Sequence, residues 1–184
     1  MLMKIDYPIA LWRRNRCGDP KTLLAPTLLT AHHELQAFKS GEESLDSWLQ
    51  DRALDNIKSG ASRTYVICRS DSLTVIGYYA ICMGQILNRD VIGSMRRNMP
   101  QHIPAVMLGR LAIDKKWQGK GLGKALLYDA VQRSTRAAQE VSARLLIVHA
   151  ISSDAEAFYG HHGFIRLPLE TPTYALDLVK FACL

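Results

Sequence analysis

Residues 118–127 have the sequence QGKGLGKALL and lie between a short β-like run and a long helical pattern. Glycines in such a stretch let successive backbone N–H groups converge on an anion, and a helix N-terminus adds a partial positive charge. Lys120 and Lys124 add whole charges beside the glycines. The stretch therefore predicts a phosphate-binding loop between a strand and a helix.

Two common phosphate-binding patterns do not fit this loop. A G-x-x-x-x-G-K-[ST] loop requires glycine where Gln118 stands and a hydroxyl where Ala125 stands. A dinucleotide-binding G-x-G-x-x-G pattern matches Gly119 and Gly121, but Lys124 takes the place of the third glycine. The remaining pattern is Q-x-x-G-x-G, beginning at Gln118. A glycine-rich turn without a ligand is the alternative.

The rest of the chain alternates between strand-like and helix-like patterns. A helix is predicted over 44–57 with Ser44 as its cap, and another over about 121–139. A short third helix begins at a cap on Ser153 and ends at Gly163. More strands than crossover helices are expected, which favours a mixed sheet over a purely parallel one. The expected strands are 27–31, 64–70, 74–84, 106–114, 143–151, 164–167 and 173–181.

The 184-residue length is typical of one domain, and the formal net charge of +6 suits a polyanionic partner. The four cysteines show no metal-ligand spacing, so reduced thiols, no metal and a cytoplasmic location are expected. No stretch is apolar enough to predict a membrane span. Residues 1–24 are interpreted as an N-terminal extension; the basic run of Arg13, Arg14 and Arg16 leaves a nucleic-acid-binding arm as the alternative.

Two segments resemble a known family. LGRLAIDKKWQGKGLGKALLYDA (108–130) resembles motif A of the GNAT acetyltransferases, and IVHAISSDAEAFYGHHGF (147–164) resembles their motif B. The expected order of elements from Pro26 onward matches that family. The resemblance implies an α/β (α+β) fold over residues 25–184, with a mixed, mostly antiparallel sheet, helices on both faces and a central pair of splayed strands.

The resemblance also implies an acetyl-CoA site. The strand backbone at Leu111, Ala112 and Ile113 would align the pantetheine. The phosphates would lie against Gln118, Gly119, Lys120, Gly121, Leu122, Gly123 and Lys124, with Ser153 and Phe158 also at the cofactor.

Tyr159 matches the position from which GNAT enzymes protonate the departing thiolate; a packed helix aromatic is the alternative. An unperturbed phenol has a pKa near ~10 and is protonated at neutral pH. His161 and His162 point in different directions on a helix and cannot share a metal, so a capping or surface role is expected. No acidic residue stands out as a base, which suits an acceptor amine of low pKa.

A closer resemblance concerns the acceptor. SGEESLDSWL (40–49), SMRRNMP (94–100) and LGRLAID (108–114) resemble the GNAT toxins of type II toxin–antitoxin systems. Those toxins acetylate the α-amine of the amino acid on charged tRNA, are countered by a ribbon-helix-helix antitoxin and are commonly homodimers. The charges of the chain are compatible with this, because Arg96, Arg97 and Arg110, together with Lys39, could form the basic surface that a tRNA backbone requires; ordinary solvated charges are the alternative.

Two alternatives to the toxin interpretation stay open. A GNAT enzyme could acetylate a protein amine or a small amine, in which case acidic residues lining the acceptor cleft would be expected. A non-catalytic CoA- or RNA-binding module is the other alternative, and it is disfavoured by the intact loop and by Tyr159.

Overall fold

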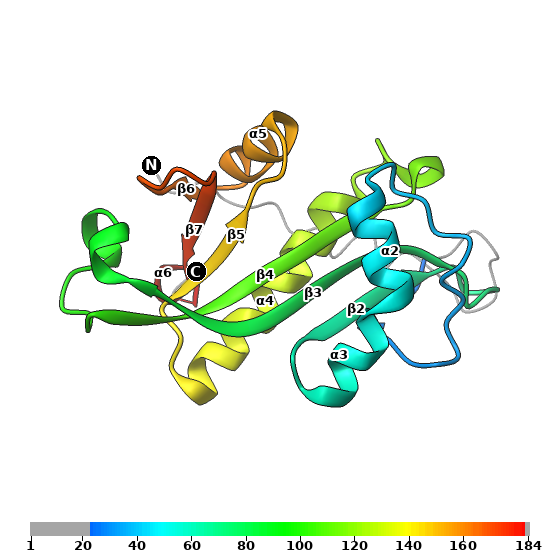
Figure 1. The fold of residues 1–184 in the computed structure, drawn as a ribbon, viewed down its shortest axis with the longest axis horizontal. Coiled ribbons are helices and arrows are strands. Elements are labelled where there is room, and N and C mark those ends of the chain that lie inside the picture. The colour runs from blue at the N-terminus through cyan, green and yellow to red at the C-terminus, as the bar shows by residue number, and fades with distance from the viewer. Residues whose placement is uncertain (1–22, 183–184) are drawn as a thin grey trace. The chain divides into compact units, whose positions relative to one another are not determined.

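The computed structural model describes residues 23–182 (Figure 1). Nearly all of the predicted extension 1–24 lies outside these residues, as do Cys17 and Cys183. The described chain forms two compact units. The first unit comprises residues 23–81 and Arg110–Ala130, and the second comprises Cys82–Gly109 and residues 131–182.

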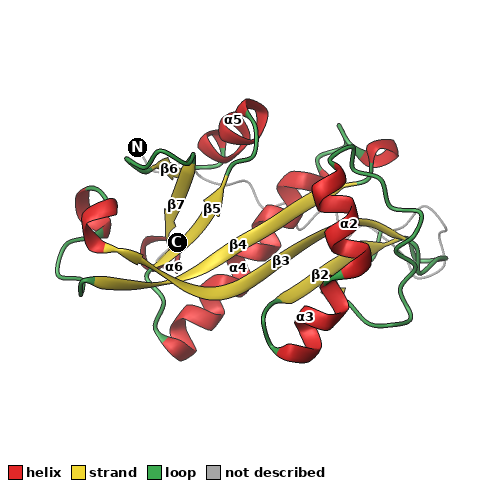
Figure 2. Ribbon diagram, in the orientation of Figure 1, coloured by secondary structure: helices red, strands yellow, loops and turns green. Residues whose placement is uncertain are grey.

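Seven strands within residues 23–182 follow the order β1-β2-β3-β4-β5-β7-β6 (Figure 2). Strands β4 and β5 are parallel, whereas the pairs β1–β2, β2–β3, β5–β7 and β6–β7 are antiparallel. The predicted mixed, mostly antiparallel sheet is therefore confirmed. The strands are β1 (Thr27–Leu28), β2 (Arg63–Cys68), β3 (Val75–Leu87), β4 (His102–Ile113), β5 (Leu145–His149), β6 (Ile165–Arg166) and β7 (Thr173–Asp177).

The helices differ from the predicted ones mainly at their ends. The helix predicted over 44–57 is two helices, separated at Arg52, which has φ −122° and ψ −26°. Its predicted cap was wrong: Glu42 is the N-cap residue and Ser44 lies inside the first turn. The helices are α2 (Glu43–Asp51), α3 (Ala53–Ser59), α4 (Leu122–Val141), α5 (Ser153–His161) and α6 (Leu178–Ala182), with 3-10 turns η1 (Asn88–Asp90), η2 (Gly93–Met95) and η3 (Lys115–Trp117).

In the first unit, two adjacent tyrosines of β3 mark the two faces of the sheet. Neighbouring residues of a strand point to opposite faces. The Tyr78 hydroxyl donates to the Leu45 carbonyl of α2 at 2.7 Å, and the Tyr79 hydroxyl donates to the Asp129 carboxylate of α4 at 2.5 Å. Helices therefore cover both faces of this part of the sheet, as Figure 1 shows for α2 and α4.

In the second unit, α5 packs on one face of the sheet and a long connecting segment packs on the other. On one face, Tyr174 of β7 donates to Glu156 of α5 at 3.0 Å. On the other face, Leu145 and Ile147 of β5 pack against Val91 and Met95. These two residues belong to the connection between β3 and β4 (residues 88–101, hereafter the β3–β4 connection). It covers the face opposite to α5.

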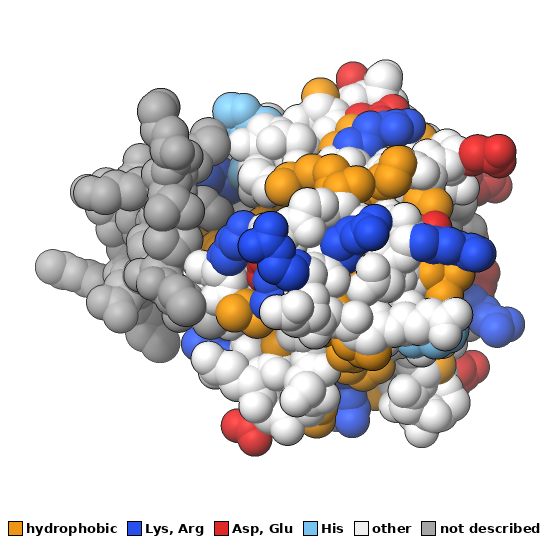
Figure 3. Space-filling model, turned by 90° about the vertical axis from the view of Figure 1, so that its left-hand side faces the viewer, with side chains coloured by type: hydrophobic (Ala, Val, Ile, Leu, Met, Phe, Trp, Pro, Cys, Tyr) orange, Lys and Arg blue, Asp and Glu red, His pale blue; other side chains and the backbone are white. Residues whose placement is uncertain are grey.

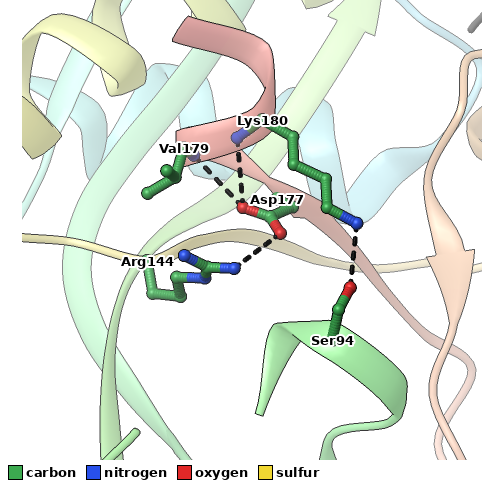
Figure 4. Close-up of polar contacts among 5 residues, drawn as sticks. All are labelled: Ser94, Arg144, Asp177, Val179 and Lys180. Atoms are coloured by element: carbon green, nitrogen blue, oxygen red, sulfur yellow. Dashed lines mark hydrogen bonds and ion pairs between the residues drawn. The ribbon is translucent and has the colours of Figure 1, made fainter. Parts of the chain in front are cut away.

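The C-terminal strand predicted over 173–181 was wrong beyond Asp177, where α6 begins. The Asp177 carboxylate accepts hydrogen bonds from the backbone N–H groups of Val179 and Lys180 and forms an ion pair with Arg144 at 2.8 Å (Figure 4). An aspartate at this position favours a helix start over a continued strand. The Lys180 ammonium donates to the Ser94 hydroxyl at 2.8 Å and ties α6 to the β3–β4 connection.

Within residues 23–182, no helix is long and apolar enough to cross a membrane.

Candidate active site

The predicted phosphate loop (residues 118–124) follows η3 and leads into α4 in the first unit. Gly119 and Gly121 have φ angles of 73° and 77°, which L side chains rarely adopt. A Cβ atom at either glycine would meet nothing within 4 Å, so backbone conformation, not crowding, requires glycine at both positions. The first N–H groups of α4 have no partner within the helix and are available to an anion.

The side chain of Gln118 holds the loop in place. Its amide donates to the Ile113 carbonyl and to the Ser40 carbonyl, each at 2.9 Å. Both N–H groups of the amide are therefore occupied by the protein. The backbone N–H of Gln118 also donates, to the Lys115 carbonyl at 3.4 Å, so Gln118 positions the loop through its side chain and its backbone.

The cations of the loop have different environments. The Lys120 ammonium donates to the Lys116 carbonyl at 2.9 Å and lies 4.5 Å from the centroid of the Trp117 ring. Lys124 is exposed on the first turn of α4. Trp117 was not among the predicted site residues, although its place just before the glycines is a signal that could have included it.

Asp114 is a second residue that the sequence interpretation missed. It is 8% exposed and lies where β4 ends. Its carboxylate accepts from the Lys39 backbone N–H at 3.1 Å and from the Lys116 backbone N–H at 3.0 Å. Asp114 therefore fixes both η3, which precedes the phosphate loop, and the backbone at Lys39.

The predicted pantetheine-binding strand is the last part of β4. Leu111 is half-buried, whereas Ala112 and Ile113 are buried. The backbone N–H of Asp114 donates to the Ile76 carbonyl at 2.9 Å, so the end of β4 is fixed to β3. In the second unit, the parallel ladder of β4 and β5 has Leu108 and Val148 as its last pair.

Tyr159 lies on α5 in the second unit and is 7% exposed. Its ring packs against Phe158 at 5.3 Å and Phe164 at 5.6 Å between centroids. Burial raises the pKa of Tyr159 to about 12. The phenol therefore holds its proton at neutral pH, as a general acid requires.

The other predicted residues of α5 take local roles in this structure. The predicted cap on Ser153 was wrong: the Ser152 hydroxyl accepts from the Ala155 N–H at 3.2 Å, and Ser153 is the exposed first helical residue. His162 bonds through Nδ1 to the Phe158 carbonyl at 2.7 Å, which fits a local role at the helix end.

Residues 23–182 contain no group of three or more His, Cys, Asp or Glu side chains that could hold a metal ion.

The arginines predicted to bind RNA lie in both units. Arg96 and Arg97 are exposed on the β3–β4 connection, where the Asn88 amide donates to the Arg96 and Met99 carbonyls at 3.0 Å. The face of the molecule that holds this connection carries several groups of Lys and Arg side chains beside a band of hydrophobic ones, with acidic side chains mostly at its edges (Figure 3).

Arg110 and Lys39 belong to the first unit. The Arg110 guanidinium lies 4.9 Å from the centroid of the Trp48 ring. Lys39 is exposed. A planar guanidinium stacked on an aromatic ring is held in one orientation, which suits recognition of a flat or forked anion.

The chain matches the family described as the acetyltransferase (GNAT) domain over residues 62–166. The chain belongs to this family, and the predicted fold class and enzyme class are confirmed. The matched segment includes the phosphate loop, Tyr159 and the β3–β4 connection.

Within this family, the chain is similar to two toxins, one of which is represented by two solved structures. The chain is 42% identical over 158 residues to a "tRNA-acetylating toxin" of Mycobacterium tuberculosis, covering 86% of this chain and 93% of that protein. It is 30% identical, with a TM-score of 0.82, to AtaT complexed with acetyl-methionyl-tRNAfMet, over 88% of this chain and 98% of AtaT.

A third structure shows a tyrosine-to-phenylalanine variant of the AtaT toxin bound to the C-terminus of the antitoxin AtaR and to acetyl-CoA. Its TM-score is 0.75 at 30% identity, over 88% of this chain and 96% of that one. The predicted resemblance to GNAT toxins is confirmed by these relatives.

Proposed function

We propose that this protein transfers acetyl from acetyl-CoA to the α-amine of the amino acid on charged tRNA and acts as the toxin of a toxin–antitoxin pair. The observation that carries the proposal is the 42% identity with a tRNA-acetylating toxin over 158 residues. The local geometry of the phosphate loop and the protonated, buried Tyr159 each support it.

The phosphate loop is suited to hold acetyl-CoA. The positive φ angles of Gly119 and Gly121 turn the backbone toward an anion, and Lys120 and Lys124 supply charge. The short turn η3 connects the loop to the end of β4, where Leu111, Ala112 and Ile113 would align the pantetheine. In this proposal Lys120 leaves the Lys116 carbonyl and takes a phosphate oxygen in its place. Leu122 and Gly123 would contribute backbone N–H groups, and Ser153 and Phe158 are proposed as further cofactor contacts.

Tyr159 is the proposed general acid. Acetyl transfer breaks the thioester C–S bond, and the departing thiolate takes a proton. An ordinary phenol is already protonated at neutral pH, and burial, which raises the pKa of Tyr159 to about 12, holds that proton more firmly. Its aromatic neighbours Phe158 and Phe164 fix the position of the ring.

Basic residues are proposed to hold the tRNA backbone. Arg96 and Arg97 are exposed on a loop whose backbone is held by Asn88, so two positive charges are presented with little freedom of the chain. Arg110 and Lys39 are proposed as further tRNA contacts. AtaT, which is similar over 88% of this chain, binds an acetylated methionyl-tRNA.

The type of antitoxin and the oligomeric state of this protein are also part of the proposal. AtaT binds the C-terminus of an antitoxin. For this chain we infer a ribbon-helix-helix antitoxin and a homodimer, with residues 25–184 as the catalytic domain and 1–24 as an extension.

The proposal is tested by supplying labelled acetyl-CoA to the protein with three acceptors in parallel. These are bulk charged tRNA, the same tRNA after deacylation, and a protein mixture. Label on charged tRNA alone is expected. Label only on protein would keep the acetyltransferase and discard the toxin, and label on uncharged tRNA would place the reaction on the nucleotide.

A further inference from the structure

His149 is the last residue of β5, at the point where β5 leaves β4. The parallel β4–β5 ladder has Leu108 and Val148 as its last pair, so His149 is the first residue of β5 beyond that ladder. Pairing continues on the other side, where His149 is directly opposite Thr173 of β7. The imidazole is thus held by one neighbouring strand and is exposed.

The face of the sheet on which His149 lies follows from strand alternation. Val148 and its partner Tyr174 point to the face covered by α5, because Tyr174 bonds to Glu156. His149 and Thr173 therefore point to the opposite face. Ile147 and Ala175 share that face and pack there in one cluster with residues of the β3–β4 connection.

The proposed proton donor and the proposed RNA-binding arginines belong to segments that cover opposite faces of β5 and β7. The helix that carries Tyr159 covers one face of β5 and β7. The connection that carries Arg96 and Arg97 covers the other face, where His149 lies. The segment that carries the proposed acceptor-binding arginines and the His149 imidazole thus lie on the same face of the sheet.

A hydrogen-bond relay fixes which nitrogen of His149 carries the proton. The Thr173 hydroxyl donates its one proton to the Thr171 carbonyl at 2.9 Å. The same oxygen lies 2.9 Å from His149 Nδ1, so it accepts there and Nδ1 must donate. In the neutral imidazole the lone pair is then on Nε2, for which residues 23–182 provide no hydrogen bond, so Nε2 is the nitrogen that can accept a proton.

We infer that His149 is the general base of the acetyl transfer, with Thr173 as the residue that positions it. The inference rests on the proposed acetylation of charged tRNA. The amine nitrogen forms a bond to the thioester carbonyl carbon and loses one proton to His149 Nε2. The C–S bond breaks, and the thiolate takes one proton from the Tyr159 hydroxyl. Both side chains return to their starting states by exchanging protons with water.

The test compares wild-type protein with His149→Ala under single turnover on charged tRNA, with and without added imidazole. The rate constant is expected to fall about 100-fold, with less than a threefold change in the half-saturating concentration of charged tRNA. Added imidazole is expected to restore the rate in proportion to its concentration. Acetyl-CoA affinity, measured by calorimetry, serves as the control for folding and is expected to be unchanged.

Thr173 provides a matched pair of variants. Thr173→Ser keeps the hydroxyl and is expected to keep most of the rate. Thr173→Val keeps the shape of the side chain but removes the acceptor for Nδ1, and its rate constant is expected to fall about tenfold. Added imidazole should not restore the rate of Thr173→Val alone. It should restore the rate of the double variant that also carries His149→Ala.

Two results would overturn the inference. One is a normal rate for His149→Ala; the other is a loss confined to tRNA affinity and not rescued by imidazole. In either case wild-type acetylation of charged tRNA would stand. If the wild-type protein itself does not label charged tRNA, the proposed function fails first.

Discussion

At the scale of single residues, the hydroxyl of Tyr159 separates binding from turnover. Tyr159→Phe keeps the ring that packs between Phe158 and Phe164 and removes only the proton donor. The turnover rate is therefore expected to fall by about 100-fold or more, with acetyl-CoA affinity unchanged. Single-turnover rates and calorimetry measure the two effects. A variant that turns over at the wild-type rate would remove Tyr159 from the mechanism.

The same residue gives a prediction about alkaline stability. Burial raises the pKa of Tyr159 from 10.0 to about 12, so between these values the unfolded chain loses the proton and the folded protein keeps it. The contribution of Tyr159 to the free energy of unfolding is thus complete below pH 10 and is lost as the pH rises toward 12. Chemical denaturation at pH 9 and pH 11 should find a smaller loss in Tyr159→Phe than in wild-type protein. Equal losses would mean that the phenol is not desolvated.

At the scale of elements, local signals predicted the glycine-rich turn and the start of α4 correctly, because both lie within residues 118–127. The break at Arg52 could not be predicted, because the apolar period of 44–57 continues across it: Leu54 and Ile57 pack against the same core as the residues before the break. The end of β7 had a local signal, the capping carboxylate of Asp177, and the apolar residues after it outweighed that signal. The orientation of His149 depends on Thr173, which is distant in sequence, so no motif could reveal it.

The phosphate loop as an element is tested by a pair of glycines with the same conformation. Gly121 in the loop has φ 77°, and Gly60 at the end of α3 has φ 76°. An added Cβ meets nothing within 4 Å at either position, so alanine should cost each about 1 kcal/mol of folding free energy through backbone strain. Only Gly121→Ala is expected to weaken the binding of acetyl-CoA, by roughly tenfold, because the backbone N–H groups of a strained loop no longer point toward the phosphates. Calorimetry with acetyl-CoA distinguishes the two variants, and equal affinities would move the phosphate site elsewhere.

At the scale of the whole molecule, the net charge of +6 would attract any polyanion. A test of tRNA binding must therefore distinguish the effect of where the positive residues lie from the effect of the total net charge. Replacing Arg96 and Arg97 by Glu removes two proposed phosphate contacts. Replacing Arg52 and Arg63 by Glu changes the net charge by the same amount at two other exposed positions.

If the β3–β4 connection binds tRNA, only the first pair of substitutions should reduce the dependence of affinity on salt. Each lost phosphate contact lowers the slope of log affinity against log salt by about 0.7–0.9, so a decrease of about 1.4–1.8 is expected for Arg96→Glu with Arg97→Glu. Binding of charged tRNA measured from low to high salt gives the slope directly, and acetyl-CoA affinity should stay constant in both variants. The same slope in the two variants would mean that net charge alone attracts the tRNA, and that the RNA-binding surface includes neither Arg96 nor Arg97.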